Sequence, residues 1–170
     1  MDFENELIPG VLIKRYKRFF VDIKLKNKTV TAHCPNPGSM IKLLDKGNPV
    51  WITKSKNKER KLKYTLQIIE VDNIKICVNT HVTNKIVQES IDKGLIKELK
   101  SFKIIRPEKK FGKDTRFDFF LYNNKTDKKA FLEVKSVSLQ RKTKHAEFPD
   151  SVTSRGKKHL ENLISAYEQG

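Results

Sequence analysis

The sequence has few cysteines and contains no long apolar run. Its 170 residues include only two cysteines, Cys34 and Cys77, which are too few for a disulfide scaffold and favour a reduced, cytoplasmic setting. No apolar stretch approaches the roughly 20 residues that a membrane helix needs. The first residues, MDFENEL, are acidic and lack the basic start and apolar core of a signal peptide. We therefore expect a cytoplasmic protein with no membrane span.

What the sequence has instead is positive charge. Lysine and arginine number 36 against 20 acidic residues, for a formal net charge of +16. Such a charge favours polyanionic partners, namely DNA, RNA or an acidic membrane surface. The lysines are spread along the chain without an amphipathic basic helix, which disfavours the membrane. Heavy lysine usage can also reflect genome composition, so charge alone leaves that alternative open. No protein partner is indicated.

The first half of the chain is typical of short strands. Apolar and β-branched residues form runs that are separated by turn-forming proline, glycine and asparagine. The runs cover 11–25, 29–34, 50–53, 62–71 and 74–78, with Asp72-Asn73 as a hairpin turn and Ser39 as the cap of a short helix at 40–45. Five short strands and one small helix predict an OB-like Greek-key barrel over residues 1–81.

The second half, residues 82–170, predicts a helix, three strands and a second helix. The expected elements are a helix at 83–93 capped by Thr83, strands at 102–105, 115–122 and 130–139, and a last helix capped by Asp150. That last helix has Leu160, Leu163, Ile164 and Tyr167 at the spacing of one face. A three-stranded mixed sheet followed by a helix normally continues into another strand. We therefore expect an α+β or α/β chain whose second domain is incomplete at its C-terminus.

Charged residues interrupt two of the apolar runs in this second half. The pattern Glu-x-Lys occurs four times in the chain, but only Glu133-Val-Lys135 stands inside an apolar run, AFLEVKSVSL, where an uncompensated carboxylate is costly to bury. Asp118 interrupts the preceding run, TRFDFFL, in the same way. If the two strands pair as a hairpin, Asp118 and Glu133 can share a face.

Two carboxylates with substrate phosphates and waters are what a Mg²⁺ or Mn²⁺ site uses. Lys135 could position a water or stabilise negative charge, and Glu89 from the first helix could complete the site. The alternative is a buried ion pair of Lys135 with Glu133 or Asp118, and of Arg116 with Asp118. A half-exposed strand is the third possibility. Spacing alone leaves all three open.

Two basic stretches are candidates for nucleic-acid contacts. Arg15, Tyr16, Lys17 and Arg18 precede Phe19, and OB-folds stack bases on aromatic residues within a basic groove. The alternative is a basic strand edge that discourages aggregation. In the last helix, Arg155, Lys157 and Lys158 stand near the N-terminus, where a phosphate could dock; a capped basic helix face explains them equally well.

Histidines and cysteines invite two further interpretations, which we rank low. The spacing of His33 and Cys34 with Cys77 and His81 fits no common zinc ligand set, and both cysteines suit small core positions. His159 is a minor candidate for a general base.

The segment PNPGSM at 35–40 most simply makes a rigid turn, although a helix N-terminus there could receive a phosphate.

Along nearly its whole length the chain resembles the sugar fermentation stimulation protein (SfsA) family. The matching stretches occur in the same order and are RYKRF at 15–19, HCPNPGSM at 33–40, VNT at 78–80, RFD at 116–118, EVKSVSL at 133–139 and FPDSVTSRGKKHL at 148–160. The resemblance implies an N-terminal OB-like domain followed by a domain of the PD-(D/E)xK nuclease type. It also implies DNA binding and a regulatory link to sugar metabolism, and family members continue beyond residue 170.

By this resemblance Asp118 takes the position of a metal-ligand aspartate. Glu133 and Lys135 take the acidic and lysine positions of the active-site strand, and Glu89 looks like the helix acid. Our first hypothesis is a DNA-binding protein with a Mg²⁺-dependent phosphodiesterase site at Asp118, Glu133 and Lys135. The alternatives are a non-catalytic DNA-binding regulator that retains a nuclease fold, and an RNA-binding or RNA-processing factor.

Overall fold

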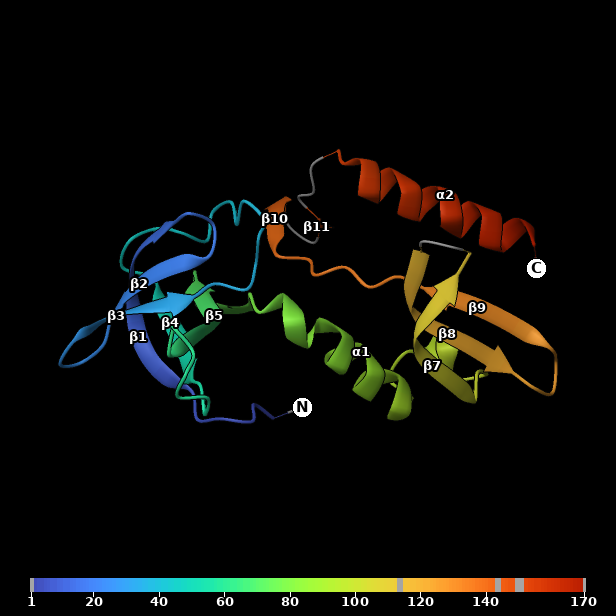
Figure 1. Cartoon of the computed structure of the whole chain (residues 1–170), viewed down its shortest axis with the longest axis horizontal. Helices are drawn as coiled ribbons and strands as arrows, with labels where there is room; N and C mark the ends of the chain where they lie inside the picture. Colours follow the sequence, from blue (N-terminus) through green and yellow to red (C-terminus); the bar gives the residue numbers. More distant parts are fainter. Residues whose placement is uncertain (1, 113–114, 143–144, 149–151, 170) are drawn as a thin grey trace. The chain divides into compact units, whose positions relative to one another are not determined.

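The computed structural model describes residues 2–112, 115–142, 145–148 and 152–169, which fall into two compact units (Figure 1). The first unit comprises Met1–Thr83 and Ser136–Asp150, and the second comprises Asn84–Lys135 and Ser151–Gly170. The expected boundary after residue 81 therefore shifts by only two residues, but segment 136–150 joins the first unit, which the sequence did not indicate. Within the described ranges, no helix is long and apolar enough to cross a membrane.

The first unit is built around a closed five-stranded barrel with one additional strand. The strand order is β3-β2-β1-β4-β5-β6, and a parallel pairing of β3 with β5 closes the barrel. The bounds are β1 Ile8–Tyr16, β2 Phe20–Lys24, β3 Thr29–His33, β4 Pro49–Lys54, β5 Tyr64–Val71 and β6 Ile74–Cys77. This arrangement confirms the OB-like barrel that the sequence predicts.

The barrel core follows from alternation along the strands. In β2, for example, Val21 and Ile23 are fully buried while their neighbours are not, as expected when successive side chains point to opposite faces. Twelve buried apolar residues from the whole barrel form one cluster. Gly10 lets β1 approach β2 closely, because a Cβ atom there would lie 2.6 Å from the Ile23 side chain.

Left-handed backbone explains two differences from the sequence expectation in this unit. The expected strand 11–25 divides into the β1–β2 hairpin, whose turn residues Lys17 and Arg18 have φ of 46° and 60°. The expected helix at 40–45 is wrong, since that segment forms turns in which Met40 and Lys42 have φ of 52° and 64°. A right-handed helix excludes such angles. The two-residue turn Asp72-Asn73 is confirmed between β5 and β6.

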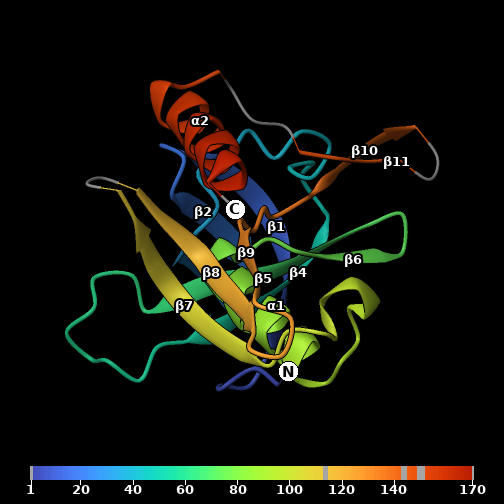
Figure 2. The same cartoon turned by 90° about the vertical axis from the view of Figure 1, so that its right-hand side faces the viewer.

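The second unit contains a three-stranded antiparallel sheet in the order β7-β8-β9, with β8 in the middle (Figure 2). All its described pairings are antiparallel, so the mixed sheet we expected does not appear among the described strands. The elements from residue 80 to 132 are η1 Thr80–Val82, α1 Thr83–Asp92, η2 Lys97–Leu99, β7 Ile104–Phe111, β8 Thr115–Asn123 and β9 Lys128–Leu132. The 3-10 turn η1 leads directly into α1. Thr83 Oγ1 donates to the carbonyl of Thr80 instead of capping the helix.

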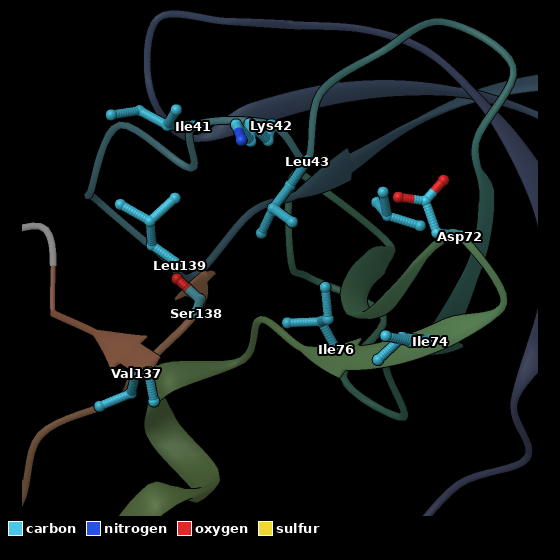
Figure 3. A pocket seen from close by; sticks show the side chains of 11 residues that line it. Ile41, Lys42, Leu43, Asp72, Ile74, Ile76, Val137, Ser138 and Leu139 are labelled. Carbon is cyan, nitrogen blue, oxygen red and sulfur yellow. The ribbon is translucent and has the colours of Figure 1, made fainter. Parts of the chain in front are cut away.

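The expected strand 130–139 is wrong in its second half. β9 ends at Leu132, and residues 133–138 have no regular structure. Leu139 then begins β10, Leu139–Lys142, which pairs with β11, His145–Glu147, in the first unit. There Val137 and Leu139 face Ile74 and Ile76 of β6 across an apolar pocket (Figure 3). Burial of Leu139 therefore ties this segment to the barrel unit.

The last helix, α2, spans Ser154–Glu168 and begins with a side-chain cap from Thr153. Thr153 Oγ1 accepts a hydrogen bond from the backbone N–H of Gly156 at 3.0 Å. The cap that we expected from Asp150 lies outside the described residues. The predicted apolar face is divided: Leu163 is half-buried beside buried Ala166, while three neighbours are exposed, namely Leu160, Ile164 and Tyr167.

Candidate active site

The candidate site lies where the pairing of β8 with β9 stops. The last paired residues are Phe119 and Leu132, and the same register continued by one residue sets Asp118 opposite Glu133. Asp118 itself is half-buried between buried Phe117 and Phe119 on β8. The hairpin that the sequence predicts therefore brings Asp118 to the segment that carries Glu133, although Glu133 stands just beyond the strand and not inside it.

Both oxygens of Asp118 accept hydrogen bonds. Oδ1 accepts from Asn84 Nδ2 of α1 at 2.8 Å, and Oδ2 accepts from the backbone N–H of Val134 at 2.7 Å. In the second bond, the carboxylate takes the place of a backbone carbonyl of a neighbouring strand as acceptor for the Val134 N–H. The strand ladder therefore ends here, and the backbone beside Glu133 is held in place. Asp118 is thus oriented by α1 on one side and by the segment after β9 on the other.

Two basic side chains contact Glu133. Its Oε1 atom lies 2.7 Å from Lys135 Nζ and 3.1 Å from His159 Nδ1 of α2. The side chains of Glu133 and His159 are 12% and 19% exposed, whereas Lys135 is 47% exposed. An ionised carboxylate can only accept, so Nδ1 of His159 carries the hydrogen in this contact. Lys135 keeps its head group in solvent, where it can reach a ligand.

Glu89 does not join this arrangement. It lies five residues after Asn84 on α1, which places it about 140° around the helix from the side chain that reaches Asp118. Lys93 Nζ lies 2.5 Å from Glu89 Oε1, and this hydrogen bond is the first of the contacts that lower the pKa of Glu89 to about 2. Among the residues that the structure describes, no group of three or more histidine, cysteine or acidic side chains could hold a metal ion.

The ion pairs that we considered as an alternative are present in part. Lys135 pairs with Glu133, as that interpretation requires. Arg116 instead lies 3.7 Å from Glu108, with both side chains more than half exposed. The sequence did not reveal the part of Asn84, which follows Thr83 at the start of α1. For His159 it suggested only a general base, whereas the structure places its ring against Glu133.

The basic residues of the β1–β2 hairpin differ in their availability. Arg15 donates to three backbone carbonyls, those of Arg18 at 2.7 Å and of Gly38 and Asn36 at 2.8 Å each. Its guanidinium therefore clamps the proline-rich loop to the hairpin. Lys17 and Arg18 are exposed at the turn between the strands.

Tyr16 is engaged within the same hairpin. Its hydroxyl donates to Asp22 Oδ1 at 3.2 Å, and its ring stacks on Phe20 with centroids 5.5 Å apart. In α2, Lys157 and Lys158 are exposed, and Lys157 lies 3.6 Å from Glu161. The side chain of Arg155 lies outside the described part of the chain. The helix thus offers lysines near its N-terminus, as predicted.

The two cysteines occupy apolar surroundings. Cys34 is fully buried in the barrel core, and Cys77 is half-buried at the end of β6. Burial raises the pKa of both thiols, which keeps them protonated at neutral pH. This agrees with the interpretation of Cys34 as a small core residue, whereas Cys77 is not part of the buried cluster.

Comparison with known proteins decides the family. Residues 13–78 match the family model described as the SfsA N-terminal OB domain, and residues 81–170 match the sugar fermentation stimulation protein RE domain. The chain belongs to the sugar fermentation stimulation protein family. The two matched domains of this family follow one another along the chain with a junction at 78–81, close to the boundary between the two units.

Relatives in the family are longer than this chain. A sugar fermentation stimulation protein homolog of Pelagibacter ubique is 52% identical over 170 residues, covering all of this chain and 72% of the relative. A homolog of Marinomonas sp. is 46% identical and covers 99% and 66% respectively. The chain thus spans about two thirds to three quarters of these family members.

A solved structure in the family has the same fold. It is the SfsA protein of Pyrococcus furiosus in complex with Ca²⁺, with a TM-score of 0.81 and 26% sequence identity. The match covers 97% of this chain and 68% of that protein. Both units therefore have counterparts in an experimentally determined family member.

Proposed function

We propose that this chain belongs to a cytoplasmic DNA-binding protein with a Mg²⁺-dependent phosphodiesterase site at Asp118, Glu133 and Lys135. The observation that carries the proposal is the hydrogen bond from the Val134 N–H to Asp118 Oδ2, beside Glu133 and its partly exposed partner Lys135. Regulation of sugar metabolism through DNA is the biological role that the family name suggests. DNA and not RNA is our choice of partner because of the resemblance to a nuclease-type domain.

The residues present fit Mg²⁺ or Mn²⁺. Magnesium is usually bound through one or two carboxylates and keeps several waters or takes substrate phosphate oxygens. Each Asp118 oxygen accepts one hydrogen bond and has a second lone pair, and Glu133 contacts Lys135 and His159 through Oε1 only. Oxygen atoms of both residues are therefore available to a divalent cation. The Ca²⁺ complex of the Pyrococcus furiosus protein supports an oxygen-ligand site in the family.

The chemistry divides between the cation and the protein. A bound Mg²⁺ would neutralise phosphate charge and lower the pKa of a water. Asp118 and Glu133 would hold it, with Asn84 and His159 fixing the orientation of the two carboxylates. Lys135, whose Nζ contacts Glu133 Oε1, would donate to the phosphate oxygen on which charge develops. Glu89 has no part in this proposal.

A cleavage assay tests the catalytic part. Single- and double-stranded DNA would be incubated with Mg²⁺ or Mn²⁺ and with wild-type protein, Asp118→Asn or Glu133→Gln. We expect the variants to lose about a hundredfold or more in rate, since metal stabilisation of phosphate charge amounts to several kcal/mol. The matched control is Glu161→Gln, an exposed carboxylate of α2, which should cleave at the wild-type rate. Equal cleavage by all variants would indicate a contaminating nuclease and contradict the proposal.

A salt titration tests the binding part. The net charge of +16 and the exposed Lys17-Arg18 turn predict a linear fall of log K with log salt. We expect affinity to fall by about a thousandfold or more between about 50 mM and about 200 mM salt if six or more phosphates are contacted. An affinity that does not change with salt would contradict binding through the phosphate backbone.

A non-catalytic DNA-binding regulator is the second candidate. It is favoured by the 2.7 Å contact of Lys135 with Glu133, which is also an ordinary ion pair, and by the finding of only two carboxylates at the site in the described chain. The regulator predicts salt-dependent DNA binding by wild-type protein without cleavage under any metal. Tighter binding of RNA than of DNA with equal sequence would favour the third candidate, an RNA-binding factor.

A further inference from the structure

Three aromatic rings gather at one end of the barrel, outside the candidate active site. Phe19 comes from the β1–β2 turn, His33 ends β3, and His81 lies in η1. The rings of Phe19 and His33 have centroids 6.2 Å apart with planes within 15° of each other. The rings of His33 and His81 have centroids 6.4 Å apart and are tilted by 39°. Segments far apart in the sequence thus build one row of rings.

The row is open to a ligand at both of its ends. Phe19 is 43% exposed. His81 is exposed as well, while His33 between them is half-buried. Flat aromatic surfaces of this kind offer faces on which another planar ring can stack.

The backbone at Phe19 and at His81 is fixed by hydrogen bonds. The carbonyl of Phe19 accepts from the N–H of Cys34 at 2.9 Å, which ties the hairpin turn to the end of β3. Beside His81, Thr80 Oγ1 donates to the carbonyl of Pro35 at 2.9 Å. The proline-rich loop is therefore one of the supports of the row.

A buried polar chain supports His81 from within the barrel. Its backbone N–H donates to Asn79 Oδ1 at 3.0 Å, and Asn79 Nδ2 donates to Gln67 Oε1 at 2.7 Å. Gln67 Nε2 in turn donates to Thr53 Oγ1 at 2.8 Å, and all three of these side chains are buried. Buried polar networks with satisfied partners hold one conformation, so the row is pre-organised.

Positive charge lies beside the rings. Arg60, in the loop between β4 and β5, donates from Nη1 to Thr65 Oγ1 at 2.9 Å. Burial, followed by Arg60 and His81, lowers the pKa of His33, so its ring is neutral at pH 7. The exposed turn Lys17-Arg18 adds charge next to Phe19.

We propose that Phe19, His33 and His81 form a base-stacking platform for an unpaired DNA strand, with Arg60 and the Lys17-Arg18 turn contacting its phosphates. Aromatic faces beside a basic groove are the combination by which proteins bind single strands without reading sequence. Duplex DNA cannot use the platform, because its base faces are stacked on each other. This proposal rests on the proposed DNA binding and assigns it a subsite.

The test compares two single strands with the same phosphates. One is a labelled thymidine oligonucleotide of about ten residues, and the other is an abasic strand of equal length. Fluorescence anisotropy at low salt gives both affinities for wild-type protein, Phe19→Ala and Phe19→Ala/His81→Ala. We expect wild-type protein to prefer the thymidine strand by about tenfold or more, and each substitution to lose roughly tenfold on that strand alone.

The controls separate stacking from charge and from misfolding. Tyr167→Ala removes an aromatic ring that is 89% exposed on α2, and it should leave both affinities unchanged. Arg60→Gln should weaken both strands equally. A Phe19→Trp variant in a Trp51→Phe background, whose thermal unfolding should match wild type, is expected to show fluorescence quenching by the thymidine strand and not by the abasic one.

Each outcome decides something. Equal wild-type affinity for the two strands overturns the platform and leaves the proposed DNA binding intact. Failure of wild-type protein to bind either strand or duplex overturns both proposals together. If the variants lose affinity for the abasic strand and for duplex as well, the rings act only by supporting the fold, and the platform is again rejected.

Discussion

The two units differ in the number of apolar residues that form their buried clusters. The barrel unit has a cluster of twelve buried apolar residues inside a closed ring of strands. The described part of the sheet unit has a cluster of three, namely Ile91, Phe119 and Leu121, under an open three-stranded sheet. Functional groups are often placed in the less stable part of a protein. Here Asp118 and Glu133 belong to the sheet unit, where strand pairing ends.

Polar groups show the same contrast. In the barrel unit, the chain of Thr53, Gln67 and Asn79 is buried and neutral, and its hydrogen bonds serve the fold. In the sheet unit, the corresponding interior bonds run through the carboxylates of Asp118 and Glu133. The polar contacts of one unit thus join buried neutral side chains, while those of the other hold two carboxylates in place. The predictions that follow test this contrast.

The largest effect is expected from Leu66→Ala in the barrel. Leu66 is fully buried on β5, so its truncation should cost about 3 to 4 kcal/mol in the free energy of unfolding. Trp51 on β4 is the chain's single tryptophan, and its fluorescence reports the barrel unit alone. Urea unfolding followed by this fluorescence should shift far more than unfolding followed by helical circular dichroism. If the fluorescence and circular dichroism transitions coincide in both wild type and variant, the two units unfold as one cooperative unit, and the proposed difference between them is contradicted.

A smaller effect is expected from Ile91→Ala in the sheet unit. Ile91 lies on α1 and is 9% exposed, so its truncation should cost about 2 kcal/mol. The loss should appear in helical circular dichroism and leave the Trp51 transition nearly unchanged. The matched control is Ile86→Ala on the same helix, which is 41% exposed and should cost much less. Equal losses for both isoleucines would mean that α1 packs differently.

Alternation along strands predicted most of the barrel, because one face of each strand is buried. It also predicted the hairpin of β8 and β9, in whose apolar runs Asp118 and Glu133 are the charged interruptions. It could not predict where β9 ends. That end depends on the Asp118 carboxylate taking the N–H of Val134, a contact between residues 16 apart in the sequence. Local patterns do not record such competition between side chain and backbone.

One other prediction failed, and one candidate residue lies apart from the other site residues. The helix at 40–45 had a plausible cap in Ser39, but the segment adopts left-handed angles while Met40 is buried in the barrel core. From the sequence, Glu89 was assigned to the site, although the spacing of residues along the helix places it on another face. Val87 and Ile91 pack toward the core, and Glu89 lies two residues from each, about 200° around the helix. Helical spacing alone could have set it apart.

A further prediction concerns the bond that orients Asp118. Asn84→Ala removes the donor to Asp118 Oδ1 and should lower the free energy of unfolding by about 1 to 2 kcal/mol, because the carboxylate is half-buried and charged. If the phosphodiesterase site is active, cleavage should fall in the same variant. Circular dichroism and the cleavage assay measure the two effects. Asn124→Ala, in the exposed loop after β8, is the control and should change neither.

The smallest effect is expected from the surface pair of Glu89 and Lys93 on α1. Hydrogen bonds, that from Lys93 first, lower the pKa of Glu89 to about 2 in the folded protein, below its ordinary value of 4.5. A depressed pKa means that the folded state favours the carboxylate, so its contribution is present above about pH 4.5 and is lost as pH falls toward about 2. The stability difference between wild type and Glu89→Gln should therefore shrink over that window, as measured by urea unfolding at several pH values. A difference that is constant from pH 7 to the lowest accessible pH would show that the Glu89 carboxylate is not held by these contacts in solution.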